Sequence, residues 1–189
     1  MKKRFVTRAV SMAAALLLLL SAFSCRPAPD TVDEDAGVSR LVTTDYPWEI
    51  ALTPHVIGNY APQISVVESR NSLIDYVSVW EKCYDFMDNS VTSMFYDIVT
   101  GYDEEFFQTQ ALVICVITAD SPSNTYSSEG IGRNGDGYDI RIRYSAPNPA
   151  ASGETVWHIF IEVPDGSPFV RDPSLLNLRL VENKNYSWL

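Results

Sequence analysis

The chain has 189 residues, and its 24 acidic residues outnumber its 14 lysines and arginines to give a formal net charge of −10. Nucleic acid and anionic lipid head groups repel a chain this acidic, so the composition argues against a nucleic-acid partner. The simplest consequence of the charge is solubility, and the first residues place the chain in an extracytoplasmic space.

Residues 1–24 have the pattern of a secretory signal peptide. Basic residues among the first eight positions precede an apolar run from Ala9 to Phe23, in which only Ser11 and Ser21 are polar. The run is short for a membrane span, which needs about 20 residues. We therefore expect a cleaved leader rather than a domain. The leader holds four basic and no acidic residues, so its loss leaves a formal net charge of −14.

Cys25 directly follows the expected cleavage point. The cleavage point fits two kinds of site, and both place the cut at the same bond: an ordinary signal-peptidase site, or the lipobox of bacterial lipoproteins, in which this cysteine is acylated. A cysteine directly after the apolar run favours lipidation. Residues 26–37 (RPAPDTVDEDAG) hold two prolines and four acidic residues. We therefore expect a lipid anchor site and a disordered tether over residues 25–45, and a membrane-anchored, extracytoplasmic protein.

Residues 46–189 are expected to form one domain. It begins with a short strand over 64–67 and an amphipathic helix, whose candidate N-cap is Ser69, or Asn71 if the helix starts later. Apolar side chains then recur at spacings of three and four, the pattern of one buried helix face: Leu73, Tyr76, Val77, Trp80 and Tyr84. Further helical turns are expected before Gly101, which is typical of a helix end.

Three carboxylates, Asp103, Glu104 and Glu105, precede the most apolar segment after the leader. They are either catalytic or metal-binding groups, or the start of a short helix that Asp103 caps and the glutamates stabilise through the helix dipole. The capping role is favoured, because no spacing marks a catalytic pair. Residues 111–120 (ALVICVITAD) are apolar at nearly every position, so both faces of this strand should be covered.

The remaining residues have the pattern of β-structure. Two strand-like runs flank residues 134–137 (NGDG), which are the residue types of a hairpin turn. Residues 138–144 and 155–164 alternate as strands do, and an apolar run over 175–181 is placed to close the sheet. The expected fold class is α+β, with N-terminal helices packed on one mostly antiparallel twisted sheet or partial barrel. One core is expected to hold Trp80, Cys115, Ile140, Trp157, Ile159 and Ile161.

One dinucleotide-binding motif is matched only formally. Gly130, Gly132 and Gly135 satisfy G-x-G-x-x-G. A dinucleotide site needs a helix after this motif, whereas the next segment has the pattern of a strand. We therefore expect these glycines to belong to a hairpin.

Metal ligation has little support in the sequence. The segment 134–139 (NGDGYD) hints at a calcium loop, but Asp139 and Ser145 stand where an EF-hand needs glycine and glutamate. Cys83 and Cys115 lack the C-x-x-C spacing of zinc and redox sites. They are buried free thiols or, in an exported chain, a disulfide. We expect neither a metal nor a cofactor.

His158 is the candidate base of an enzymatic interpretation. It is one of only two histidines and lies in a strand pattern beside Trp157. A surface hydrolase whose site is assembled from His158, serines and carboxylates stays open. No G-x-S-x-G or H-E-x-x-H motif occurs, however, and a lone histidine in a strand is more often packed than catalytic. No residue is therefore assigned as catalytic.

The order of the elements carries a family resemblance. A strand, a serine-containing helix start, YDEEFF (102–107), an apolar strand, a glycine-turn hairpin and VWHIFIEVP (156–164) follow one another over about 64–163. This order resembles a group of uncharacterised lipoproteins of Gram-positive bacteria and, more distantly, the PrcB-like protease-complex stability family. The distant family has a Pro-x-Gly-Gly-Tyr turn where this chain has SPSNTY (121–126).

The resemblance implies a non-enzymatic accessory lipoprotein that steadies or assembles a partner at the cell surface, either an envelope protein or a protease. The expected partners are thus the membrane, through the lipid on Cys25, and an envelope protein. Val156 and Phe160, on the second face of their strand, are candidate partner-contact residues. A covering helix explains the same apolar pattern.

Overall fold

The structure, a computed structural model, describes residues 43–87, 95–147 and 152–183. The predicted signal peptide (1–24), Cys25 and most of the predicted tether (25–45) lie outside the described residues. Thr43 and Thr44, at the end of that tether, form the first strand, β1. The described fold therefore begins slightly before the predicted boundary at residue 46.

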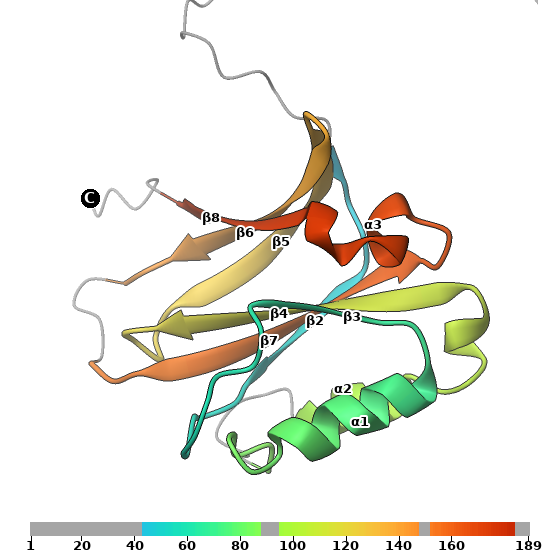
Figure 1. Cartoon of the computed structure of the whole chain (residues 1–189). Coiled ribbons are helices and arrows are strands. Elements are labelled where there is room, and N and C mark those ends of the chain that lie inside the picture. Colours follow the sequence, from blue (N-terminus) through green and yellow to red (C-terminus); the bar gives the residue numbers. More distant parts are fainter. Residues whose placement is uncertain (1–42, 88–94, 148–151, 184–189) are drawn as a thin grey trace, which may run out of the picture. The chain divides into compact units, whose positions relative to one another are not determined.

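The described strands form two sheets of four strands each. Sheet A contains, in spatial order, β1 (Thr43–Thr44), β5 (Thr125–Asn134), β6 (Gly137–Ser145) and β8 (Leu176–Glu182). Sheet B contains β2 (Trp48–Leu52), β7 (Thr155–Pro164), β4 (Gln110–Ala119) and β3 (Ile64–Val67). Figure 1 shows sheet A above sheet B, as two layers.

Neighbouring strands are antiparallel except for β6 and β8, which are parallel. After β7, the short helix α3 (Pro168–Arg171) and the 3₁₀ helix η2 (Pro173–Leu175) lead the chain back to sheet A. The described part of the chain is thus mostly β, with mainly antiparallel sheets and few helices. The expected single sheet is wrong, because β4 and β7 are apolar on both faces and a second sheet covers one of these faces.

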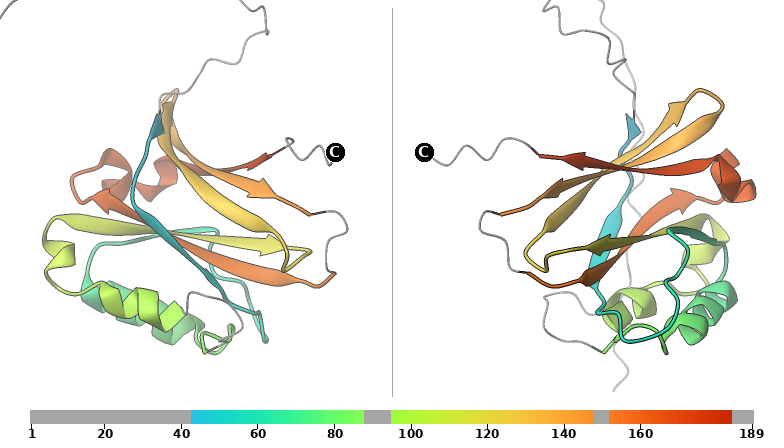
Figure 2. Two further views of the ribbon diagram at one scale, coloured as in Figure 1. Left: turned by 180° about the vertical axis from the view of Figure 1, so that it is seen from behind. Right: turned by 60° about the vertical axis from the view of Figure 1, so that its left-hand side comes forward.

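Helices α1 (Arg70–Trp80) and α2 (Phe95–Gly101) lie on the face of sheet B that points away from sheet A (Figure 2). Ser69 caps α1 as predicted, because its side chain accepts a hydrogen bond from the backbone N–H of Ser72 at 3.1 Å. Helix α2 ends at the predicted Gly101. Three strands precede α1, so the structure does not show helices at the N-terminal end of the fold.

Strand β4 separates two apolar clusters, because its side chains alternate between the faces of sheet B. Leu112 and Ile114 pack on the helix side, whereas Val113 and Cys115 pack between the sheets. Both faces are covered, which confirms the prediction of a central strand. Trp80 packs on the helix side, so the prediction that it shares one core with Cys115 is wrong. The other five residues of the predicted core lie together between the sheets.

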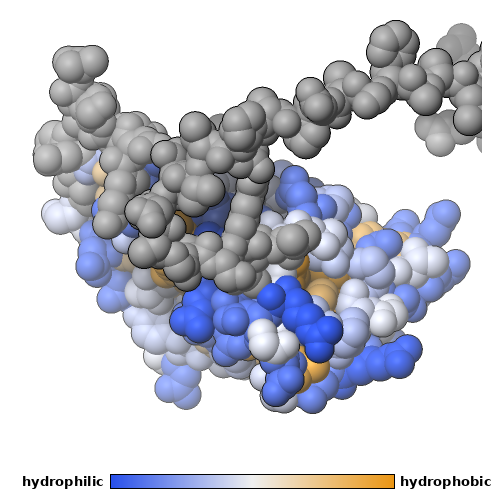
Figure 3. All heavy atoms as spheres, turned by 90° about the horizontal axis from the view of Figure 1, so that it is seen from above, coloured by the Kyte–Doolittle hydropathy of each residue, from blue (hydrophilic) through white to orange (hydrophobic). Residues whose placement is uncertain are grey.

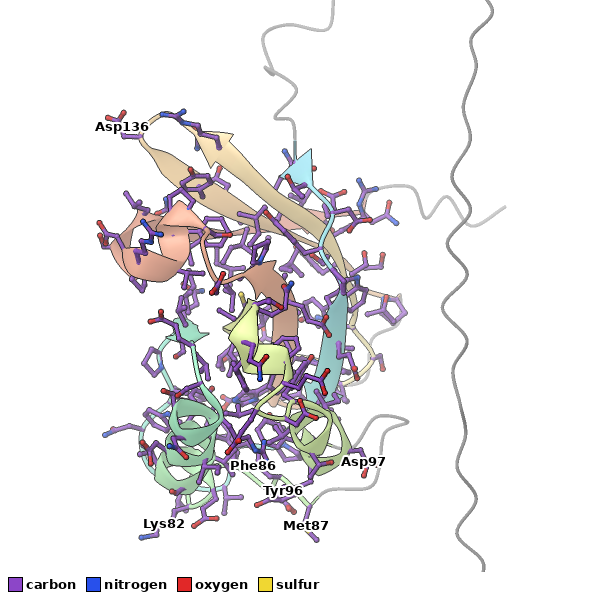
Figure 4. All side chains as sticks on the ribbon, turned by 90° about the vertical axis from the view of Figure 1, so that its right-hand side faces the viewer. Lys82, Phe86, Met87, Tyr96, Asp97 and Asp136 are labelled. Atoms are coloured by element: carbon purple, nitrogen blue, oxygen red, sulfur yellow. The ribbon has the colours of Figure 1, made fainter. Side chains whose placement is uncertain are left out.

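The turn between β5 and β6 is the predicted hairpin, with Asn134 paired with Gly137. Gly135 has a φ of +61°, a left-handed conformation that glycine adopts without steric cost. The G-x-G-x-x-G match lies in β5 and this turn, which confirms that its glycines belong to a hairpin. Figure 4 places Asp136, one of the calcium candidates, at the tip of the hairpin.

Candidate functional site: a cleft between the two sheets

A cleft of about 500 Å³ lies between the two sheets, at the end where β4, β6 and β8 finish. This volume falls in the range of ordinary small-ligand sites, about 300–1,000 Å³. Its apolar lining consists of Ile117, Ala119, Tyr126, Tyr144, Ala146 and Leu180. Thr118, Asp120 and Asn124 add polar groups to the lining.

The sheet register positions the aromatic wall of the cleft. Tyr126 of β5 and Tyr144 of β6 lie directly opposite each other, with ring centroids 6.4 Å apart. Tyr126 also packs against Trp157 of β7, with ring centroids 5.5 Å apart. Leu180 follows the buried Leu176 on the same face of β8 but is 46% exposed, because the cleft separates the sheets at this end.

Polar groups near the cleft are incompletely paired. Trp157 Nε1 and Asn124 Oδ1 are buried atoms without a hydrogen-bond partner among the described residues. Ser121 is buried, and its Oγ accepts a hydrogen bond from the backbone N–H of Ser123 at 3.1 Å. Asp120 is exposed. Since buried polar groups are nearly always hydrogen-bonded, the two unpaired atoms distinguish this end of the sandwich from the rest of the space between the sheets.

His158 lies on the other face of sheet B, in the cluster beneath α1 and α2. Its fully buried ring meets four aromatic rings edge to face, at centroid distances from 5.0 to 6.1 Å: those of Tyr76, Tyr84, Phe86 and Phe95. Figure 4 shows Phe86 among the side chains between the two helices, whereas Met87 points away from them. Burial lowers the pKa of His158 to about 3, so the imidazole is neutral at physiological pH.

The hydrogen bonding of His158 is that of a packed residue. Its Nδ1 lies 2.6 Å from Oγ1 of Thr53, and its Nε2 has no partner among the described residues. The hydrolase interpretation needs a pocket in which His158 meets a serine and a carboxylate. The ring is instead surrounded by aromatic side chains, and the cleft lies on the opposite face of the sheet.

Val156 and Phe160, predicted as partner-contact residues, are fully buried. Both belong to the cluster beneath the helices, where the ring centroid of Phe160 lies 5.5 Å from that of Phe95. The prediction that they form an exposed contact patch is therefore wrong. The alternative left open by the sequence, a covering helix, explains the apolar second face of β7.

Asp103 starts the 3₁₀ helix η1 (Phe106–Gln108), because its Oδ1 accepts a hydrogen bond from the backbone N–H of Phe106 at 2.9 Å. Glu104 and Glu105 are exposed. The Asp103 side chain therefore binds the first N–H of η1, as predicted for a helix start. The N-cap position of this single 3₁₀ turn is Glu105, however, so the two glutamates do not lie in its first turn as predicted.

Cys83 and Cys115 are free thiols, so the disulfide that the sequence left open is not formed in this structure. Cys115 lies between the sheets and Cys83 on the helix side. Burial raises the pKa of the Cys115 thiol to about 12. The described residues contain no group of three or more His, Cys, Asp or Glu side chains suited to a metal ion. No helix in the described ranges is long and apolar enough to cross a membrane.

The sequence alone did not identify the cleft. Its residues come from four strands, the turn after β4, and positions just after β6 and just before β7, and no sequence spacing connects them. The available signal was the pair Tyr126 and Tyr144, which stand at corresponding distances from the hairpin turn at 134–137. A hairpin with its turn at these residues aligns the two tyrosines directly.

Comparisons of the chain with protein-family models, with curated proteins and with solved structures found no match.

Proposed function

We propose that the protein is an extracytoplasmic lipoprotein, held at the membrane by a lipid on Cys25, that binds and steadies another envelope protein without catalysing a reaction. The observation that carries the binding role is the cleft of about 500 Å³ between the sheets. A concave apolar site with a few polar groups is the usual form of a binding site.

The composition of the cleft supports recognition of another molecule. Tyr126 and Tyr144 present large amphipathic side chains, which are enriched where proteins bind partners. Leu180 leaves apolar surface open to solvent at the same place. Where Figure 3 shows the surface from the side of sheet A, hydrophilic residues surround small hydrophobic patches.

The anchor and the finer fold assignment are parts of the same proposal. The basic leader, the apolar run and Cys25 support lipidation, and the acidic residues 26–37 support a tether. The layer formed by α1 and α2 on sheet B supports the α+β class, with helices packed on one face of a sheet.

A surface hydrolase built around His158 is the rival function. Its support is Nε2 of His158, which has no hydrogen-bond partner in the described part of the chain and lies in the same cluster as the Tyr76 hydroxyl, which has none there either. A substrate has to displace buried aromatic side chains to reach this nitrogen, and a base with a pKa of about 3 accepts protons weakly at neutral pH. The cleft therefore provides the better-supported site.

Metabolic labelling with a fatty-acid analogue tests the anchor. The wild-type protein should incorporate label and fractionate with membranes, whereas a Cys25→Ser variant should do neither. Equal labelling of both proteins, or of neither, would contradict the anchor.

Co-purification from detergent-solubilised membranes tests the binding role. The wild-type protein should recover one envelope protein in a stoichiometric amount. Recovery of no partner, together with turnover in a screen of ester and peptide substrates that His158→Leu abolishes, would replace the binding role with the hydrolase.

A further inference from the structure

Strand β4 continues past the end of its neighbour β3. The last paired residues of these strands are Cys115 and Ile64, and one more hydrogen bond joins the Val116 N–H to the Gln63 carbonyl oxygen at 2.9 Å. On its other side β4 stays paired with β7 as far as Ala119. Figure 1 shows this end of β4 reaching beyond β3. Among the described strands, none pairs with residues 117–119 on the β3 side.

The backbone of Thr118 points toward this free edge. In an antiparallel strand the N–H and C=O groups of alternate residues point to the same side. The N–H of Val116 points to β3, so the backbone groups of Thr118, two residues later, point the same way. Continuing the register places Ala61 opposite Thr118, but the backbone N–H of Ala61 donates to the hydroxyl of Tyr84 at 2.7 Å instead of extending the ladder.

The free edge borders the cleft. Ile117 and Ala119 lie on either side of Thr118, and their side chains line the cleft from the inner face of sheet B. Side chains of paired strands lie side by side on each face of a sheet. A strand added beside Thr118 therefore places one of its own side chains against Ile117 and Ala119, inside the cleft.

We propose that this edge and cleft together bind an extended peptide segment of the partner protein. The segment adds to sheet B beside β4, its backbone hydrogen-bonds to Thr118, and one large apolar side chain enters the space between Tyr126, Tyr144 and Leu180. This inference rests on the proposed binding function and names the form of the partner.

Charge specifies the segment further. Asp120 is exposed at the end of β4 and lines the cleft, and the whole chain has a formal net charge of −10. The bound segment therefore carries lysine or arginine next to its apolar residue, and acidic segments are disfavoured.

A displayed library of heptapeptides, selected on the purified protein, supplies the probe. We expect enriched peptides to alternate apolar and polar residues and to contain lysine or arginine. Binding of a selected peptide should weaken at least about tenfold when the amide facing Thr118 is N-methylated, because one main-chain hydrogen bond is lost. This test needs no change to the protein.

Two matched variants locate the site. Leu180→Asp places a negative charge in the cleft, whereas Ile74→Asp places one on α1, away from the cleft. The two side chains are similarly exposed, Leu180 at 46% and Ile74 at 49%. Because both positions are at the surface, both variants should fold, which a melting curve checks. Peptide affinity should fall at least about tenfold for Leu180→Asp and stay unchanged for Ile74→Asp.

Three results would overturn the inference. They are a selection in which no peptide is enriched on the wild-type protein relative to the Leu180→Asp protein, a selection that yields acidic peptides, and equal affinity of N-methylated and unmodified peptides. Failure of the inference is distinguishable from failure of the proposed function. If Leu180→Asp recovers the same envelope protein as the wild type, the binding function stands and the peptide site is wrong. If neither protein recovers a partner, the proposed function itself fails.

Discussion

Thr53 Oγ1 lies 2.6 Å from Nδ1 of His158, at the centre of the cluster beneath the helices. Thr53 follows β2 and His158 lies in β7, so this side-chain contact adds to the backbone pairing of the two strands. The hydroxyl gives the neutral imidazole one partner, and aromatic rings surround the rest of the ring. His158 is therefore best understood as a structural residue whose neutrality the fold requires.

Acid should destabilise the protein through His158. Burial lowers its pKa from 6.5 to about 3 in the folded protein, so below pH 6.5 the unfolded chain binds a proton that the folded chain does not. The free energy of unfolding should thus fall as pH decreases from 6.5 to 3, by at most about 1.4 kcal/mol per pH unit from this group. Denaturant titrations of the wild type and His158→Leu between these pH values measure the difference. If the free energy of unfolding depended on pH in the same way in both proteins, His158 would not be the source of the acid destabilisation.

Truncation between the sheets should destabilise the fold far more than neutralising the helix-start carboxylates. Ile159 is fully buried, and replacing such a residue by alanine typically costs about 2–5 kcal/mol. Glu104→Gln and Glu105→Gln change exposed side chains and should shift the free energy of unfolding by less than about 0.5 kcal/mol. If either glutamine variant matched Ile159→Ala, the interpretation of these glutamates as solvated residues would be wrong.

Two glycines with positive φ should respond differently to alanine. A Cβ on Gly130 meets the Thr44 carbonyl oxygen at 2.0 Å, so Gly130→Ala should push β1 away from β5. A Cβ on Gly135 meets nothing within 4 Å, so Gly135→Ala carries only the backbone cost of a φ of +61°, about 1 kcal/mol. The melting temperature of the Gly130→Ala protein should therefore be well below that of the Gly135→Ala protein. A lower melting temperature for Gly135→Ala than for Gly130→Ala would contradict the close packing of β1 against Gly130.

Cys83 and Cys115 should remain reduced in the folded protein. Cys115 is fully buried and its pKa is raised to about 12, so a thiol reagent should not label it in the folded protein. Denaturation without reductant should make both Cys83 and Cys115 reactive in a Cys25→Ser protein. Mass spectrometry that finds a linked Cys83–Cys115 pair instead would contradict the described arrangement.

Local patterns in the sequence predicted local structure well. The cap at Ser69, the end of α2 at Gly101 and the hairpin turn at 134–137 each depend on residues within a few positions of one another. The segment 111–120, apolar at nearly every position, also predicted correctly that both faces of its strand are covered.

Long-range packing was less accessible to sequence reasoning. The apolar second face of β7 fits either an exposed contact or a covered one, and only the position of α1 and α2 shows that Val156 and Phe160 are covered. Likewise, the division into two sheets depends on β5 and β6 pairing with β1 and β8 rather than with β4 or β7. The cleft exists because of that division, so its residues have no common sequence signal.

Photo-cross-linking in intact cells tests the central claim, that the cleft holds an envelope partner, most directly. A photoreactive phenylalanine derivative is placed at Leu180 in the cleft and, as a control, at the similarly exposed Ile74 on α1. The account predicts one cross-linked envelope protein at position 180 and none at position 74. The same products at both positions, or no product at position 180, would contradict it.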